Sequence, residues 1–151
     1  MESVTEQDGS TWVPVEITEG PLKGYSWYPD SDPFETLAGP MGRRHNGDGS
    51  YSCAFFAEEK HCNGHGHLHG GMLMTFADYS LFGIASDVLD GPCVTVSFNS
   101  EFISAVGPGQ LIEAHGEVVR NTRTLVFVRG TITGGGQTLL TFSGIVKRIK
   151  K

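Results

Sequence analysis

Apolar side chains recur at every third or fourth position in the stretch that follows residue 69. This spacing predicts a helix over about residues 70–88 that packs on a sheet through one apolar stripe. The stripe consists of Leu73, Phe76, Ala77, Leu81, Ile84 and Val88. Because the other sides of the helix also carry apolar residues, we expect it to be buried on more than one side, by the sheet and by a second subunit.

After residue 92 the period of the hydrophobic pattern changes to two, which predicts strands. In the first strand we expect one face to carry Val94, Val96, Phe98 and Phe102, and the other to carry Thr95, Ser97, Asn99 and Glu101. Turn sequences separate three more predicted strands, over about residues 111–120, 125–133 and 138–149. An earlier strand, over about residues 50–57, follows the hairpin signal Asn46-Gly47-Asp48-Gly49.

One helix followed by strands on short connections predicts an α+β fold, in which an antiparallel sheet has the helix on one face. Parallel strands would need crossovers of a dozen or more residues, which these turns do not provide. The length of 151 residues is that of one domain. We expect residues 1–41, which are rich in proline and aromatic residues, to form an arm that packs on a domain formed by residues 42–151.

Composition narrows the class of function. The chain has 11 Lys and Arg against 17 Asp and Glu, a net charge of −6, so a nucleic-acid partner is not expected. Its first residues lack a signal-peptide pattern and its apolar runs are too short to span a bilayer, so no membrane association is expected. Three widely spaced cysteines, Cys53, Cys62 and Cys93, are typical of a reduced protein, and we expect a cytoplasmic location.

Asp78 is the only formal charge between Lys60 and Asp87. A carboxylate among apolar neighbours is costly unless it is partnered, hydrated or protonated. One interpretation is structural: Asp78 caps a backbone group or pairs with an arginine such as Arg120 or Arg129. The other is chemical: Asp78 is a general base or a nucleophile in a mostly apolar pocket.

Gly70 and Gly71 open the same helix and leave its first backbone N–H groups uncovered. These amides lie at the positive end of the helix dipole and can stabilise a substrate oxygen that gains negative charge; alternatively, the glycines only permit close packing. At about 1.5 Å rise per residue, Gly70 and Asp78 lie roughly 12 Å apart along the axis, so one carbonyl cannot touch both. If both act on one bond, the acid comes from the partner in a dimer with antiparallel helices.

The combination of Asn63, the run His69-Gly70-Gly71 and Asp78 resembles the signature of hotdog-fold acyl-CoA thioesterases. The phenylacetate-degradation (PaaI) and 4-hydroxybenzoyl-CoA branch is the most similar. The resemblance covers about residues 42–147 and implies an antiparallel sheet wrapped around one long central helix.

The resemblance implies a role for each matching position. Asn63 and the Gly70 amide would polarise the thioester carbonyl, and Asp78 of the facing subunit would activate water or attack directly. His69 would brace the loop at the helix start, and Thr95 would help to place the water, with Ser97 as the second candidate for this role.

Further positions are expected to contact the substrate or its coenzyme A group: Gly71, Phe82, Ser97, Arg120 and Arg123. The resemblance implies no metal and no prosthetic group, because coenzyme A arrives as part of the substrate. It implies a homodimer, or a dimer of dimers. Aryl and medium-chain acyl groups both remain open, and residues 32–35 and 37–41 of the arm are candidates for shaping the acyl pocket.

Two alternatives remain beside the thioesterase. The loop before the helix carries five potential zinc ligands, His61, Cys62, His65, His67 and His69, which leaves a metal-dependent hydrolase open. No distant His/Cys set completes a recognised zinc pattern, so we expect no metal. The second alternative is a protein that binds acyl-CoA or another apolar ligand without hydrolysing it, although such a binder has little use for a carboxylate aimed at the thioester.

Overall fold

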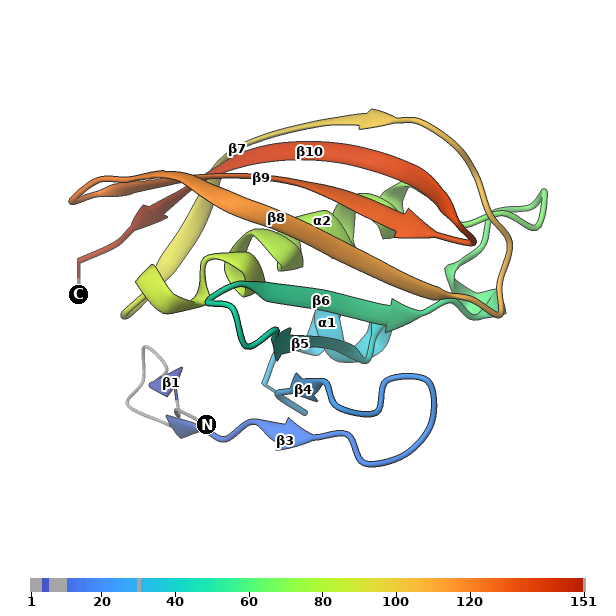
Figure 1. Cartoon of the computed structure of the whole chain (residues 1–151), viewed down its shortest axis with the longest axis horizontal. Helices are drawn as coiled ribbons and strands as arrows, with labels where there is room; N and C mark the ends of the chain where they lie inside the picture. Colours follow the sequence, from blue (N-terminus) through green and yellow to red (C-terminus); the bar gives the residue numbers. More distant parts are fainter. Residues whose placement is uncertain (1–3, 6–10, 30, 151) are drawn as a thin grey trace.

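The computed structural model describes residues 4–5, 11–29 and 31–150. An eight-stranded antiparallel sheet, in the order β3-β4-β5-β6-β8-β9-β10-β7, curves around one helix, α2 (Gly70–Ile84) (Figure 1). The long strands are β5 (Met41–His45), β6 (Tyr51–Phe56), β7 (Cys93–Phe102), β8 (Leu111–Asn121), β9 (Leu125–Gly134) and β10 (Gln137–Arg148). This architecture confirms the predicted α+β class and the hotdog arrangement.

The smaller elements belong to the arm and to the two ends of α2. They are β1 (Val4–Thr5), β2 (Thr11–Trp12), β3 (Val15–Glu16), β4 (Ser26–Trp27), α1 (Pro33–Ala38) and the 3-10 turns η1 (Glu59–His61) and η2 (Ser86–Val88). Strands β6, β8, β9 and β10 begin and end within one residue of the predicted limits. The described residues include no helix that is long and apolar enough to cross a membrane.

The core lies between α2 and the inner face of the sheet. Phe76, Ala77 and Leu81 of α2 are fully buried, together with Phe55 of β6 and Ile112 of β8. Burying each of the large side chains stabilises the fold by about 1.5–3 kcal/mol. The predicted apolar stripe therefore faces the sheet, as its spacing indicated.

The helix is shorter than the predicted range of residues 70–88, because it ends at Ile84. The Ser86 hydroxyl donates a hydrogen bond to the Gly83 carbonyl at 2.5 Å, and residues Ser86–Val88 form the 3-10 turn η2. Serine side chains that bond to nearby backbone groups compete with regular helix. The apolar periodicity continues past this point, so the pattern alone did not locate the end.

Strand β7 contains a bulge that breaks the predicted alternation of its two faces. Ser97 pairs with Ile145 and Thr95 pairs with Val146, which leaves Val96 as an extra residue. As a result Thr95 lies on the inner side with the buried Val146, whereas the Val96 side chain is 53% exposed. The expectation that Thr95 shares a face with Ser97, Asn99 and Glu101 is therefore wrong.

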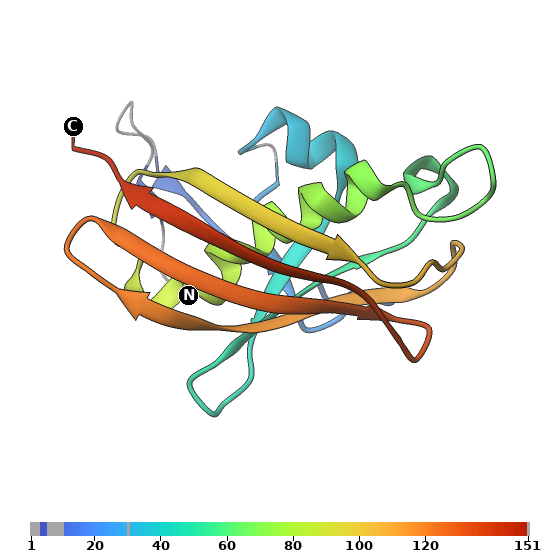
Figure 2. The same cartoon turned by 90° about the horizontal axis from the view of Figure 1, so that it is seen from above.

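The arm continues the sheet beyond β5. Strand β4 pairs with β5 through Ser26 and Arg43, and β3 pairs with β4. The Arg43 guanidinium donates to the Tyr28 hydroxyl at 3.0 Å, and the Arg44 guanidinium lies over the Tyr25 ring. Viewed from above, α1 lies beside α2 (Figure 2). The arm is thus held by aromatic and cationic contacts, and it brings a second helix next to α2.

Candidate active site

The loop that precedes α2 is shaped by the side chain of Asn63. Its carboxamide oxygen accepts hydrogen bonds from the backbone N–H groups of His65 and His67, at 2.9 and 3.2 Å. An isolated antiparallel β-bridge between the backbones of Cys62 and Leu68 closes the loop. Because the oxygen of Asn63 is used inside the loop, its exposed NH₂ group is the part left to donate to a substrate oxygen.

The first turn of α2 presents a free backbone donor. The Nδ1 atom of His69 accepts a hydrogen bond from the Gly71 N–H at 2.8 Å, which caps the helix and fixes the ring. Among the described residues, the Gly70 N–H has no acceptor. A Cβ at Gly70 would approach the Phe102 ring to 3.1 Å, so a larger residue would crowd this amide. A bare N–H at the positive end of a helix suits an oxyanion.

Asp78 lies on the exposed side of α2, two turns after the loop. The Thr95 hydroxyl donates to its Oδ1 atom at 2.7 Å. This contact depends on the β7 bulge, which turns Thr95 toward the helix. The second carboxylate oxygen of Asp78 is left without a partner in the described part of the chain.

The structural interpretation of Asp78 as an arginine partner is wrong. Arg129 forms an ion pair with Glu117 on the other face of the sheet, and within the described residues Asp78 forms no ion pair with Arg120 or any other cation. In the described residues the Asp78 carboxylate is therefore oriented by one hydroxyl and has no cation beside it.

Asp78 and Gly70 belong to one unbroken helix, so the separation of roughly 12 Å along its axis stands. Apolar side chains are exposed on the elements around Asp78: Phe34 and Leu37 of α1, Met74 of α2, and Val94, Val96 and Phe102 of β7.

Glu35 belongs to residues 32–35, which the sequence indicated as a candidate for shaping the acyl pocket but not as a partner of Asp78. Asp32 caps α1 by accepting from the Glu35 N–H at 3.0 Å, and Pro33 occupies the first turn, so the local signal for a short helix is present. Burial, and to a smaller extent the charges of Asp32 and Asp78, together raise the pKa of the Glu35 carboxyl to about 7. Only the tertiary fold brings Glu35 within electrostatic range of Asp78, and no sequence pattern indicated this.

The other predicted contact residues are scattered. Ser97 lies on the outer face of the sheet, opposite Ile145, and Phe82 is half-buried against the core. Arg120 and Arg123 are exposed at the β8–β9 hairpin, at the other end of the molecule from the Asn63 loop (Figure 1). Within the chain, the structure therefore brings together Thr95 and Asp78, and separately Asn63, His69 and Gly70.

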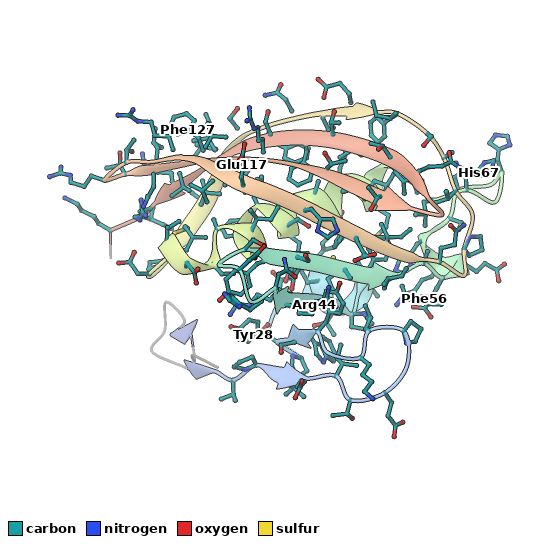
Figure 3. The ribbon with its side chains drawn as sticks, viewed as in Figure 1. Tyr28, Arg44, Phe56, His67, Glu117 and Phe127 are labelled. Atoms are coloured by element: carbon teal, nitrogen blue, oxygen red, sulfur yellow. The ribbon has the colours of Figure 1, made fainter. Side chains whose placement is uncertain are left out.

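The loop histidines do not converge on a metal site. His61 is buried, its Nδ1 accepts from the Glu58 N–H at 3.0 Å, and its Nε2 donates to the Ala38 carbonyl at 2.5 Å. His65 and His67 are exposed, and His67 projects from the tip of the loop (Figure 3). The described residues contain no group of three His, Cys, Asp or Glu side chains that could hold a metal ion.

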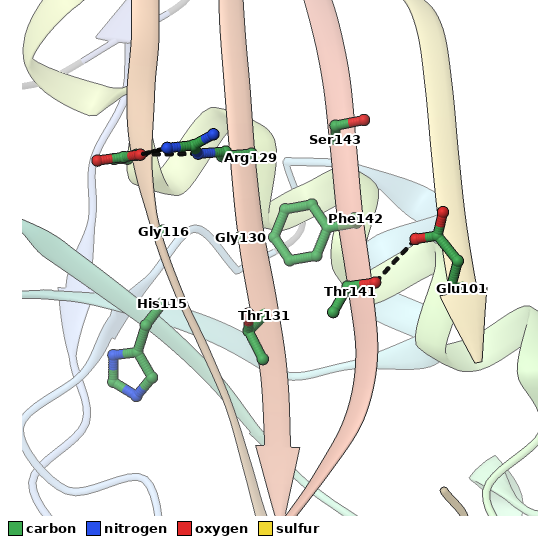
Figure 4. Close-up of a pocket in the computed structure, with 10 residues that line it drawn as sticks. Glu101, His115, Gly116, Arg129, Gly130, Thr131, Thr141, Phe142 and Ser143 are labelled. Carbon is green, nitrogen blue, oxygen red and sulfur yellow. Dashed lines mark hydrogen bonds and ion pairs between the residues drawn. The ribbon is translucent and has the colours of Figure 1, made fainter. Parts of the chain in front are cut away.

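A shallow hollow of about 610 Å³ lies on the outer face of the sheet, away from α2 (Figure 4). Its polar groups already pair with one another: Thr141 donates to Glu101 at 2.8 Å, and Arg129 donates to Glu117 at 2.7 Å. None of the predicted site residues lines this hollow. The candidate active site is therefore on the α2 side of the sheet.

Comparison with known proteins identifies the family of the chain. The sequence profile of the thioesterase superfamily matches residues 65–141, which include the start of α2 and Asp78. The Pseudomonas aeruginosa protein named "Putative esterase PA0474" is 31% identical over 117 residues, which cover 76% of this chain and 87% of that protein. Human acyl-coenzyme A thioesterase 13 is 29% identical over 101 residues, which cover 66% of this chain and 72% of that protein.

A solved structure shares both fold and sequence. A mutant of the phenylacetic acid degradation protein PaaI from Thermus thermophilus superposes with a TM-score of 0.66 at 30% identity, covering 78% of this chain and all of that one (100%). Profile, relatives and fold agree, and the chain belongs to the thioesterase superfamily.

Proposed function

We propose that this thioesterase hydrolyses acyl-CoA thioesters at a site shared between the two subunits of a homodimer. The observation that carries the proposal is the Asp78 carboxylate, which is oriented by Thr95 at 2.7 Å and has no cation beside it in the described residues. Human acyl-coenzyme A thioesterase 13, a relative at 29% identity, supports the substrate class.

In this mechanism the carbonyl and the water are handled by different subunits. The Asn63 NH₂ group and the Gly70 N–H donate to the thioester oxygen, which becomes more negative as the carbonyl is attacked. Asp78 of the partner subunit takes a proton from water, and the hydroxide adds to the carbonyl carbon. When the C–S bond breaks, the proton held by Asp78 passes to the departing thiolate, which leaves a carboxylic acid and free coenzyme A.

The direct path is the alternative for the same residues. Here the free oxygen of Asp78 attacks the carbonyl carbon, expels the thiolate and forms a mixed anhydride that water then hydrolyses. After a single turnover in H₂¹⁸O, ¹⁸O in Asp78 identifies the direct path, with hydrolysis of the anhydride at its aspartyl carbon. Water that attacks the acyl carbon leaves ¹⁸O in the product acid on either path.

Because α2 is apolar on most of its sides, we propose that the substrate carries an aryl or medium-chain acyl group. Phe82 and the exposed Phe34, Leu37 and Met74 would lie near this group. A twofold axis that reverses the α2 helices brings the partner's β8–β9 hairpin toward Gly70. On this arrangement Arg120 and Arg123 of the partner subunit are candidates for the coenzyme A phosphates. We propose no metal or prosthetic group, and a dimer of dimers as the larger assembly.

A panel of aryl and aliphatic acyl-CoA esters, assayed with a thiol reagent, tests the proposal. We expect Asp78→Asn to lower kcat by about two to four orders of magnitude and to leave KM within about threefold, as for an acid–base group. Asp87→Asn, the same change at an exposed carboxylate of η2, is the control and should behave as the parent. Full activity of Asp78→Asn, or binding of acyl-CoA with no turnover by the parent, would overturn the proposal.

A further inference from the structure

The two glycines that open α2 each lie against an aromatic ring. If a Cβ is placed on Gly70, its nearest neighbours outside the helix backbone are the Cε1 and Cζ atoms of the Phe102 ring, at 3.1 and 3.2 Å. A Cβ on Gly71 would instead meet the His69 ring, at 3.0 Å. Gly70 is half-buried, whereas His69 and Gly71 are exposed. The Phe102 ring therefore lies directly on the residue that supplies the predicted oxyanion donor.

The ring is also close to the Gly70 amide itself. The Cβ and the backbone nitrogen of one residue lie about 2.5 Å apart, because both are bonded to the same Cα. The nearest ring atom is 3.1 Å from the Cβ position, so it lies within about 5.6 Å of the Gly70 nitrogen. A thioester oxygen that accepts a hydrogen bond from this N–H therefore lies next to the ring.

The chain on both sides of Phe102 is anchored, which fixes the place of the ring. Phe102 pairs with the fully buried Leu140 of β10. Before it, the Glu101 carboxylate accepts from the Thr141 hydroxyl (Figure 4). After it, the Ile103 N–H donates to a carbonyl of β10 at 2.8 Å. The Phe102 side chain is nevertheless 55% exposed, so the ring is fixed at the start of α2 although it adds little to the core.

We propose that Phe102 is a positioning residue that acts through Gly70: its ring keeps water from one side of the Gly70 N–H. This inference rests on the proposed function. Water that reaches the amide competes for its proton and weakens its hydrogen bond to a developing negative charge. A hydrocarbon ring excludes that water and offers no competing acceptor. Because the thioester oxygen is most negative in the transition state, the benefit should appear in kcat rather than in KM.

Removing the ring tests this role. We expect Phe102→Ala to lower kcat by about 5- to 20-fold, less than the loss of about 100- to 1,000-fold that follows removal of an oxyanion donor, and to leave KM within about threefold. Phe102→Leu keeps an apolar cover and should stay within about threefold of the parent's kcat. Phe127→Ala removes the same ring from the outer face of the sheet (Figure 3) and should keep the parent's kcat. An unchanged kcat in Phe102→Ala, or equal losses in its alanine and leucine variants, would overturn the inference.

A measurement without substrate separates this inference from the proposed function. In NMR of ¹⁵N-glycine-labelled protein, the Gly70 N–H should exchange with water at least about threefold faster in Phe102→Ala than in the parent or in Phe127→Ala. An unchanged exchange rate would overturn the inference alone. A loss of kcat explained by dissociation of the subunits, seen by size-exclusion chromatography, would do the same. Absence of turnover by the parent with every acyl-CoA ester would overturn both proposals.

Discussion

Replacing Glu35 with glutamine should change how the stability of the protein depends on pH. The pKa of this carboxyl rises from 4.5 to about 7 on folding. A shift of one unit corresponds to about 1.36 kcal/mol, so the full shift sets a ceiling of about 3 kcal/mol. Glu35 keeps part of its surface in water, which screens the charge, and we expect about 1–2 kcal/mol.

The sign follows from the direction of the shift. The folded protein binds the Glu35 proton more tightly than the unfolded chain, so this stabilisation is complete below pH 4.5 and is lost as the pH rises through about 7. Glutamine carries no charge at any pH. The free energy of unfolding of Glu35→Gln, minus that of the parent, should therefore rise between these two values and then stay constant.

Urea denaturation at about five pH values from 4.5 to 8.5 measures this difference, with the m value unchanged between the proteins. Glu16→Gln, with an exposed carboxyl, should give a difference that is flat with pH. A flat difference for Glu35→Gln, or a variant less stable than the parent near pH 8, would refute the reasoning.

Two further predictions concern Thr95 and Gly83. Thr95→Val keeps the branched shape and removes the hydrogen bond to Asp78, so kcat should fall by about 10- to 100-fold, with thermal stability within a few degrees of the parent; an unchanged kcat would contradict this role. In Gly83→Ala the new Cβ would collide with the buried Cys53 sulfur, and differential scanning calorimetry should show a loss of about 1–3 kcal/mol. Adding Cys53→Ala should restore part of that loss, and a purely additive effect of the two changes would contradict the collision.

Local signals accounted for the main elements of the fold. The apolar stripe located α2, and glycine-rich turns located the strands, because helix and strand periods and turn geometry are short-range properties. The turn at Asn46-Gly47-Asp48-Gly49 has Gly47 and Gly49 at positive φ, as its sequence indicated. The order of the Asn63 loop and then Gly70 as the first residue of α2 also followed from the local sequence.

Features that depend on pairing between distant segments were not predictable in this way. The bulge at Val96 arises from the register of β7 against β10, and it alone decides that Thr95 faces Asp78. The clamp from His61 to Ala38 and the placement of Glu35 join residues far apart in the chain. The alternation of residues along one strand is a local pattern, and so is the capping of the helix in the arm. Neither pattern specifies which distant segments pair or contact each other.

The claim that each site is built from two subunits is tested most directly by mixing two inactive variants. Asn63→Ala lacks a predicted carbonyl donor and Asp78→Asn lacks the predicted base. In a mixed dimer, one site receives both defects and the other receives none. With random exchange of equal amounts, about half of the dimers are mixed, so about a quarter of the parent's activity should return. Activity that stays at the level of the separate variants, after mass spectrometry has confirmed the exchange of subunits, would contradict the shared site.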